Sequence, residues 1–490
     1  MPKEMPESSA RSRVCNVLVI GTGAAGLRAA IAATQAGSQV LVVGKRDRLD
    51  AHTVLAAGGI NAVLGTRDPQ DTWEQHFADT LREGYFLGHP RVVEIMAREA
   101  PDAVRELAAW GCRFATLEDG RLDQRFFGAH KYRRTCYAGD YTGRAILYTL
   151  ATKVQEMGIP VIEDQYVSRL LVADSVCFGA YGFDLVSGER TVFEADAVIL
   201  ATGGHTRLWR RSSSRRDENY GEGMFLALDA GCRLMDMELV QFHPTGMLTP
   251  EEMAGTLVTE AVRGEGGRLY NRDHERFMQR YDPQRMELSA RDRVALAIYT
   301  EIIEGRGGPN GGVFLDISKQ PMEVAPTAHY SMGGIAVDPE THATEVVGLY
   351  AAGECTSGLH GANRLGGNSL AETVIFGRRA GAAAAAHSRE SEVQRRSKTA
   401  VQEAADELQG LIRPGSELAR PLQRVVRDLM WEHGGVVRDE GRMRDGLLKL
   451  GEIADASRTV DIRPGEEGWF ELAHVLDLRA GLRTAEATLA

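Results

Sequence analysis

A glycine-rich turn near the N-terminus has the residue types and spacing that bind the phosphates of a dinucleotide. It reads G-T-G-A-A-G over residues 21–26. Gly21 allows a tight turn, Gly23 lets the backbone approach a pyrophosphate, and Gly26 lets the following helix pack on the preceding strand. Because the N-terminus of that helix faces the turn, its N–H groups favour bound negative charge. The motif therefore predicts dinucleotide binding.

The end of the second predicted strand departs from this pattern. An acidic side chain that binds the adenine ribose is expected there, about 20 residues after the glycines. The chain has Gly44 and Lys45 instead. We therefore expect Lys45 to contact a phosphate or the ribose.

Two later turns also follow buried apolar runs. Residues 201–204 read A-T-G-G, and Gly353-Glu354 follows a further run. Both resemble the remaining FAD contacts of flavoproteins whose sheet is built in two parts. A carboxylate at the mouth of a buried strand can accept hydrogen bonds from ribityl hydroxyls, so we predict that Glu354 contacts the cofactor. The alternative is a carboxylate that merely starts a turn or helix.

Alternating strands and helices are expected to hold these turns in place. Strands are predicted at residues 14–20, 39–43, 161–163, 195–201 and 348–352, and helices at residues 27–36, 71–82, 90–110 and 143–157. Strand, glycine turn, helix and strand in this order are typical of a doubly wound α/β sheet. The predicted fold class is α/β, with a doubly wound, Rossmann-like FAD-binding domain, an inserted α+β capping domain and a C-terminal helical domain. The predicted boundaries are 14–236 and 328–385 for the FAD-binding domain, 237–327 for the capping domain and 386–490 for the helical domain.

Composition excludes several other classes of protein. A chain of 490 residues with 43% hydrophobic residues can bury a large core without disulfides. A net charge of −11 disfavours nucleic acid as a partner, because no basic excess neutralises phosphates. The six cysteines are scattered without CxxC spacing, so we expect neither a metal site nor an iron–sulfur cluster held by this chain. Electrons leaving a flavin here must pass to another chain or to a small molecule.

Targeting signals are also missing from the sequence pattern. Residues 1–13 are polar and lack the apolar stretch of a secretory signal. No apolar run reaches the ~20 residues needed to span a bilayer. We expect a cytoplasmic protein without direct membrane insertion.

Six segments together resemble the flavoprotein subunit of succinate dehydrogenase and fumarate reductase. They are DAHTVLAAGGI at 50–60, QFHPTG at 241–246, TEAVRGEGG at 259–267, SARD at 289–292, PTAHYSMGG at 326–334 and LHGANRLGGNSL at 359–370. They occur in the order of the family's signatures, and the resemblance extends over nearly the whole chain from Val14. It implies an FAD enzyme that interconverts succinate and fumarate by hydride transfer at flavin N5.

The resemblance also implies how FAD is held. His52 matches the histidine that bonds covalently to the flavin 8α carbon, and the alternative is a histidine that merely packs near the ring. The full set of expected cofactor contacts is Gly21, Gly23, Ala25, Gly26, Lys45, His52, Thr53, Gly58, Ala201, Thr202, Gly203, Glu222, Glu354, Ser369 and Leu370. Ala57 departs from the family, which usually carries Gln or Glu there.

A dianionic substrate needs cations and donors that replace its water. The resemblance implies that His243, Thr259, His329, Arg364 and Gly59 supply this site. It makes Arg291 the acid or base, with Glu260 and Arg263 as a relay towards solvent. This role is unusual because a guanidinium seldom gives up its proton. Taken singly, the two histidines and Arg291 would be interpreted as structural or surface residues.

Two alternatives remain open. L-aspartate oxidase is a relative with the same core, but it normally has a serine-like residue at the position of His52 and a glutamate at the position of Phe127. Leu365-Gly366 and Met332 also differ from the oxidase pattern, whereas residues 130–134 and 142–144 are somewhat oxidase-like. A flavin-binding interaction protein that has lost catalysis is the second alternative, and the intact set of candidate catalytic residues argues against it.

The resemblance implies partners as well. We expect an iron–sulfur subunit that leads on to a membrane quinone-reactive anchor, which would place the protein peripherally on the cytoplasmic face of the membrane. Two departures weaken this expectation. The stretch between Ser318 and Ala328 is shorter than in the family, which predicts a smaller and more open cap. The chain also stops at Ala490, where the family continues into a segment that helps seat the iron–sulfur subunit.

Overall fold

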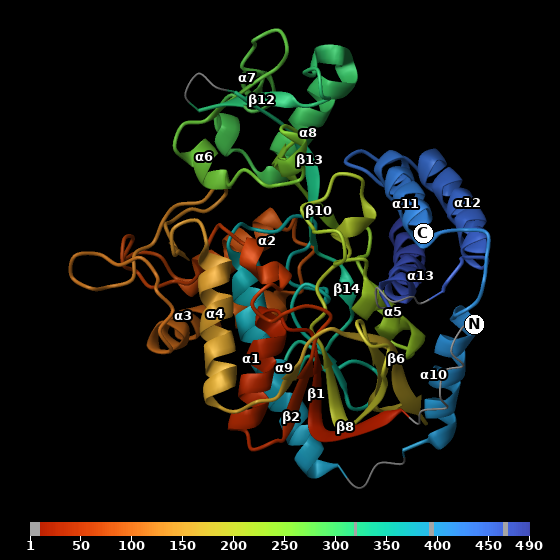
Figure 1. Ribbon diagram of the computed structural model, residues 1–490. Coiled ribbons are helices and arrows are strands. Elements are labelled where there is room, and N and C mark those ends of the chain that lie inside the picture. The colour runs from red at the N-terminus through yellow and green to blue at the C-terminus, as the bar shows by residue number, and fades with distance from the viewer. Residues whose placement is uncertain (1–9, 318–320, 392–395, 464–468) are drawn as a thin grey trace.

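A mixed sheet lies at the centre of the fold and has seven strands within the residues that the structure describes (Figure 1). The computed structural model describes residues 10–317, 321–391, 396–463 and 469–490. Most of the polar segment 1–13 and three residues of the predicted cap, 318–320, therefore lie outside the described residues. In spatial order the strands are β5 (Val161–Ile162), β2 (Val40–Val43), β1 (Arg11–Ile20), β8 (Arg190–Leu200), β7 (Val176–Asp184) and β6 (Gln165–Ala173), with β15 (Leu349–Ala351) paired to β8.

The parallel part of this sheet brings the predicted cofactor turns to one edge. β1 pairs in parallel with β2 and β8, and β15 pairs in parallel with β8. Ile20 lies opposite Val43 and Leu200, and Ala351 also lies opposite Leu200. These strands therefore end together, so the glycine turn, Lys45, Thr202 and Glu354 emerge at the same edge. This is where ligands bind in open α/β sheets.

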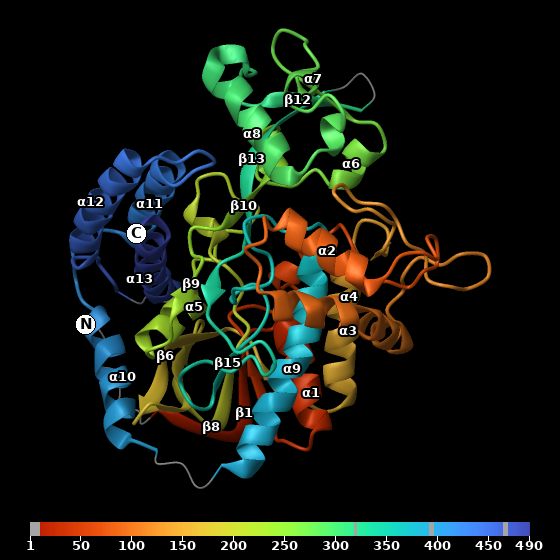
Figure 2. The same ribbon diagram turned by 180° about the vertical axis from the view of Figure 1, so that it is seen from behind.

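Helices cover one face of the parallel strands. α1 (Ala24–Gln35) packs against α9 (Asn368–Glu390) and α4 (Thr142–Glu156), as Figures 1 and 2 show. Small residues allow the close approach: a Cβ added at Gly377 would lie 2.5 Å from the Ala25 carbonyl oxygen, and one at Gly381 would lie 2.2 Å from that of Ala29. α2 (Trp73–Glu83) and α3 (Pro90–Ala109) complete this side. The opposite face carries α5 (Glu222–Asp229) and the short pair β9 (Leu234–Met235) and β14 (Gly334–Ile335).

A second, smaller sheet forms the cap at the top of Figure 1. Its order is β10 (Val240–Met247), β13 (Met322–Ser331), β12 (Val313–Asp316) and β11 (Arg268–Tyr270), all antiparallel. Its helices are α6 (Glu260–Gly264), α7 (Met278–Tyr281) and α8 (Arg291–Glu301). The cap has its own apolar core, which includes Leu269, Phe277 and Ile298. β10 and β13 connect the cap to the rest of the chain.

The C-terminal part is helical. α11 (Ala419–His433), α12 (Glu440–Ser457) and α13 (Phe470–Leu489) pack together, and α13 also contacts α5. α10 (Lys398–Leu411) lies along β6 and β7 at the sheet edge. The remaining short elements are β3 (Ile60–Asn61), β4 (Thr135–Cys136), η1 (His52–Leu55), η2 (Thr206–Leu208), η3 (Glu251–Met253), η4 (Met286–Leu288) and η5 (Ile302–Arg306).

The predicted fold class is confirmed, with shifts of one to five residues at the ends of predicted elements. The antiparallel extension β6–β7 was not predicted. β13 continues through residue 327 and α9 through residue 385, so each of these predicted boundaries falls inside an element. None of the helices in the described part of the chain has the length and apolar character needed to cross a bilayer.

Candidate active site

One large cavity joins the glycine turn to the cap. Its volume is about 1490 Å³, larger than the ~300–1,000 Å³ of a usual small-molecule site. Every predicted site residue lines it except Gly26 and Arg263. The cavity therefore has room for a dinucleotide cofactor together with a small substrate.

The glycine turn has the close contacts expected of a phosphate cradle. Gly21 has a φ of +124°, and a Cβ there would lie 2.1 Å from the Ala201 carbonyl oxygen. Gly26 does not line the cavity. It packs against the turn instead, because a Cβ at Gly26 would lie 2.0 Å from the Gly21 carbonyl oxygen. The backbone N–H of Ala24 donates to Thr53 Oγ1 at 3.2 Å, which ties the segment carrying His52 to this turn.

Lys45 lines the cavity, but its ammonium group is already paired. It donates to Asp477 Oδ1 at 2.7 Å and to Glu222 Oε1 at 3.2 Å. Burial alone would lower the pKa of Lys45, but the two carboxylates raise it above its ordinary value. Glu222 also lines the cavity, so a carboxylate is present near the place where the sequence lacks the ribose-binding acid. Asp477 comes from α13, 432 residues away, and no sequence signal identifies it.

Two polar groups at the carboxyl end of the sheet fit a ligand rich in hydroxyl groups. Glu354 Oε1 accepts a hydrogen bond from the Ser331 N–H at 3.0 Å, and burial raises the pKa of Glu354 to about 7. Thr202 Oγ1 is buried without a hydrogen-bond partner among the described residues. An unpaired buried hydroxyl is costly, so a bound ligand is its natural partner. The residues of this edge thus fit an FAD.

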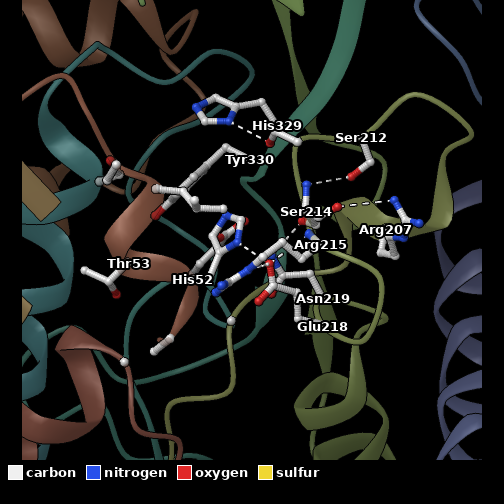
Figure 3. Close-up of a pocket in the computed structure, with 18 of the residues that line it drawn as sticks. His52, Thr53, Arg207, Ser212, Ser214, Arg215, Glu218, Asn219, His329 and Tyr330 are labelled. Carbon is white, nitrogen blue, oxygen red and sulfur yellow. Dashed lines mark hydrogen bonds and ion pairs between the residues drawn. The ribbon is translucent and has the colours of Figure 1, made fainter. Parts of the chain in front are cut away.

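His52 contacts the carboxylate of Glu218, a residue outside the sequence motifs. Its Nδ1 lies 2.6 Å from Glu218 Oε1, a contact drawn in Figure 3. The backbone N–H of Arg215 donates to the same oxygen at 2.8 Å. Glu218 lies 166 residues from His52, so sequence spacing could not have paired them.

The predicted substrate residues converge from three elements. His243 lies on β10, His329 on β13 and Arg364 in the turn before α9. The two imidazole rings meet edge to face with centroids 5.3 Å apart. His243 Nδ1 accepts the Thr245 N–H at 3.3 Å, which leaves Nε2 as the protonated donor. Burial and then Arg291 lower the pKa of His243 well below its ordinary value, so its ring is neutral.

Arg364 is the buried cation of this group. Its guanidinium carbon lies 4.3 Å from the centre of the Tyr330 ring, and its Nη1 donates to Ser369 Oγ at 3.1 Å. Its Nε is buried without a partner among the described residues. Burial and the charge of Arg291 lower the pKa of Arg364 to about 10, which keeps it charged at neutral pH. An unpaired donor on a buried cation favours an anionic ligand.

Arg291 and Glu260 form a buried ion pair beside these residues. Arg291 begins α8, and its Nε donates to Glu260 Oε2 at 2.8 Å. Its Nη1 donates to Gln241 Oε1 at 3.2 Å. Burial alone would raise the pKa of Glu260, but Arg291 and Arg263 lower it to about 2. Arg263 Nη2 lies 4.0 Å from the same carboxylate, so the three side chains form a row that leaves the cavity wall.

The remaining predicted residues shape the cavity wall. Thr259 caps α6, since its hydroxyl accepts the Ala261 N–H at 3.4 Å. A Cβ at Gly59 would lie 2.6 Å from the Cys136 carbonyl oxygen, and one at Gly58 would lie 3.0 Å from the Phe127 ring. Ser369 and Leu370 begin α9 and line the cavity.

The fold and this cavity define an FAD-dependent oxidoreductase, and comparisons with known proteins specify its family. A family model described as FAD binding domain matches residues 16–322 and 312–370. One relative is a subunit of the fumarate reductase (CoM/CoB) of Methanothermobacter marburgensis, 41% identical over 500 residues, which cover 96% of this chain and 90% of that protein. The succinate dehydrogenase flavoprotein subunit of Rickettsia conorii is 35% identical over 94% of this chain and 85% of its own length.

Solved structures agree with these relatives. The FrdA chain of E. coli quinol fumarate reductase superposes with a TM-score of 0.92 at 33% identity, over 98% of this chain and 89% of that chain. This chain belongs to the family of flavoprotein subunits of succinate dehydrogenases and fumarate reductases. The family, the enzyme class and FAD as cofactor, predicted from the motifs, are confirmed.

Proposed function

We propose that this chain interconverts succinate and fumarate, with Arg291 as the proton donor or acceptor. When bound, FAD supplies a hydride donor and acceptor at its N5 atom. The observation that carries the proposal is the convergence of Arg291, Arg364, His243 and His329 on the cavity that also contains the glycine turn. A small dianion placed among these groups would contact donors on several sides.

Two kinds of group would bind the substrate. The free Nε donor of Arg364 suits a carboxylate, because a guanidinium can fix both oxygens in one plane. The neutral imidazoles of His243 and His329 add directional donors rather than charge. Thr259 and Gly59 border the same space. We propose that these residues hold one carboxylate and polarise the carbon chain beside the flavin.

The proton would travel through the row of Arg291, Glu260 and Arg263. Glu260 is charged at neutral pH and bridges the two guanidinium groups. Arg263 Nη1 donates to the carbonyl oxygen of Glu287 at 2.6 Å, and the Glu287 carboxylate pairs with Arg276, whose side chain is 36% exposed. The row therefore leads from the cavity towards the surface of the cap. Glu260, which accepts a hydrogen bond from Arg291, would pass on the proton that restores the guanidinium after each turnover.

We further propose that FAD is bound covalently through His52 and that Glu222, Glu354 and Thr202 contact its hydroxyl groups. His52 lies in the cavity beside Thr53, which is tied to the glycine turn. A covalent link would retain the cofactor and raise its potential towards that needed for succinate oxidation. Mass analysis of the acid-denatured protein tests this directly: flavin mass should remain on the peptide that contains His52, and complete release of flavin would refute the attachment.

The proposal also includes partner subunits that receive the electrons. The relatives are named as subunits of larger enzymes, and the described residues contain no group of His, Cys, Asp and Glu that could hold a metal ion. We propose that the electron partner is an iron–sulfur subunit, which passes electrons on to a quinone-reactive anchor. This arrangement would place the chain at the cytoplasmic face of the membrane.

Steady-state turnover separates the proposed reaction from the aspartate oxidase alternative. The protein should oxidise succinate with an artificial dye and reduce fumarate with a reduced dye. Phe127 is buried at the cavity wall, where the oxidase would carry a carboxylate for the substrate amino group. We therefore expect no hydrogen peroxide from aspartate. Peroxide from aspartate without succinate turnover would overturn the proposal.

A further inference from the structure

The carboxylate of Glu218 is placed to control the chemistry of His52. Its side chain is 8% exposed, and its Oε1 lies 2.6 Å from His52 Nδ1 (Figure 3). Arg215 fixes this oxygen through its backbone N–H at 2.8 Å and its guanidinium Nε at 3.3 Å. Glu218 therefore has little freedom to move away from the imidazole ring.

This contact selects one tautomer of the ring. An ionised carboxylate can only accept hydrogen bonds, so Nδ1 of His52 must carry a proton. Nε2 is then the nitrogen that remains available to the cavity. A carboxylate on the far nitrogen also makes Nε2 a stronger nucleophile, as in other histidines oriented by an acid.

Charges around the ring would stabilise a positive charge on it once Nε2 is bonded to carbon. Burial alone would lower the pKa of His52, but Glu218 raises it above its ordinary value. Burial alone would raise the pKa of Glu218, but His52 and Arg215 hold it well below its usual range. The other charged or titratable groups that face this pair are Glu354, His329, Arg46 and Asp50.

We infer that Glu218 is a positioning residue that directs Nε2 of His52 to the flavin and keeps the linked ring protonated. The inference rests on the proposed function, because it takes covalent attachment through His52 as given. Attachment forms a bond from Nε2 to the 8α carbon and breaks one C–H bond of the 8-methyl group. The proton passes to solvent and the electron pair reduces the isoalloxazine ring. Fumarate, the oxidant of the proposed reaction, removes that pair and two protons as succinate.

The attached ring retains a single exchangeable proton, and Glu218 holds it. Once Nε2 is bonded to carbon, only the proton on Nδ1 can leave, and its loss makes the ring neutral. The hydrogen bond to Glu218 opposes that loss. A positive ring next to the flavin stabilises the electron-rich reduced cofactor, which raises the reduction potential.

Glu218→Gln in the full-length, flavin-loaded protein tests the inference with two readouts other than turnover. The fraction of flavin that survives acid denaturation should fall. The midpoint potential at pH 7.5 should also fall, and a tenfold shift of the oxidation–reduction equilibrium would appear as about 30 mV for two electrons. In addition, a plot of the midpoint potential of this variant against pH should show a new change of slope near the ordinary histidine pKa of about 6.5. The linked ring of the variant can lose its proton at that pH.

Asp217→Asn is the matched control. Asp217 is the neighbouring acid on the same loop, with a side chain 47% exposed, and it contacts His474 and Arg420 instead of His52. Both readouts should stay at their wild-type values in this variant. Glu218→Asp keeps the charge and should restore part of the covalent flavin and part of the potential. If Glu218→Gln fails to fold, Glu218→Ala carries the test, and wild-type values of both readouts in that variant would overturn the inference.

The outcomes separate this inference from the proposed function. If wild-type protein keeps its flavin after acid denaturation and Glu218→Gln matches it in covalent fraction and in potential at every pH, the inference is wrong and the attachment stands. If wild-type protein itself releases all of its flavin, the attachment and the inference are overturned together.

Discussion

Arg291 illustrates how the fold brings a residue without local signals into the candidate active site. Its position at the start of α8 is typical of a surface side chain, yet it is only 9% exposed. Glu260 and Gln241 accept hydrogen bonds from two of its nitrogens, which fixes the plane of the guanidinium. The side chain also lines the cavity. This fixed orientation is consistent with the proposed role of Arg291 as proton donor.

Replacement of Arg291 by alanine should therefore remove turnover and leave binding largely intact. We expect kcat to fall by about 10²–10⁴, the usual contribution of a positioned acid or base, while the dissociation constant for succinate changes by only a few fold. Stopped-flow turnover and titration of the flavin absorbance measure the two quantities. Arg293→Ala is the control, because Arg293 lies on the same helix but is exposed. An Arg291→Ala protein with full activity would refute the proton-donor role.

Arg364 should behave in the opposite way, because its proposed role is binding. Arg364→Lys keeps a charge but loses the planar fork and the stacking on Tyr330. We expect KM for fumarate to rise about 10- to 100-fold, since one charge-assisted hydrogen bond is worth ~1.5–3 kcal/mol. The measurement is the dependence of rate on fumarate concentration. An unchanged KM with a lowered kcat would place Arg364 in the chemical step instead.

At the scale of elements, the turn between β1 and α1 depends on backbone geometry more than on side-chain chemistry. Gly21→Ala combines a φ of +124° with a Cβ that would lie 2.1 Å from a backbone oxygen. We expect the purified variant to contain little FAD, as measured by its visible absorbance.

Gly37→Ala is the matched control, because Gly37 also has a positive φ, +91°, but no described atom lies within 4 Å of the added Cβ. Gly37→Ala should cost ~1 kcal/mol of stability and retain FAD. Normal FAD content in Gly21→Ala would contradict the proposed cradle.

The end of α8 anchors the cap through one buried carboxylate. Glu301 is fully buried and accepts hydrogen bonds from Arg306 at 2.6 Å, Tyr281 at 2.7 Å and Asn271 at 2.9 Å. Burial alone would raise the pKa of Glu301, but these donors lower it to about 2. The folded pKa lies below the unfolded one, so this stabilisation is present above about pH 4.5 and is lost as the pH falls through about 2.

Glu301→Gln should therefore destabilise the cap at neutral pH by about 3 kcal/mol, since the pKa of Glu301 falls from 4.5 to about 2 and each pKa unit corresponds to ~1.4 kcal/mol. Hydrogen exchange of α8 and β11 at pH 7 measures this locally, and the difference from wild type should shrink in acid. Glu304→Gln is the control: Glu304 also pairs with Arg306, but its side chain is 51% exposed, so it should contribute under about 1 kcal/mol. Equal effects of the two changes would contradict the account.

Sequence patterns predicted those elements whose residues form continuous apolar runs. β2, the second half of β1 and the end of β8 are buried on both faces, so their residues form continuous apolar runs. The β6–β7 hairpin escaped prediction because short polar turns bound it and polar residues interrupt its runs. The site residues within family motifs were predicted, whereas Glu218 and Asp477 were not. Their partners lie 166 and 432 residues away, and only the folded chain brings them together.

In the whole molecule, the cavity lies where the sheet edge, the cap and the C-terminal helices meet. The sheet edge supplies the cofactor turns, the cap supplies Arg291 and Glu260, and the helical part closes the side that contains Lys45 through Asp477. The parallel part of the sheet and the cap each have an apolar core of their own, whereas the core of the helical part is shared with β6, β7 and β10. Because β10 and β13 connect the cap to the sheet, a small movement of these strands would carry Arg291 relative to the flavin.

The most direct test of the central claim is a crystal structure of the FAD-loaded protein with bound succinate. We expect one carboxylate on Arg364 and His243, the carbon chain against the flavin ring, and the Arg291 guanidinium within ~3–3.5 Å of a central carbon on the opposite face. A dicarboxylate bound away from the ring, or an Arg291 that faces the same side as the flavin, would contradict it.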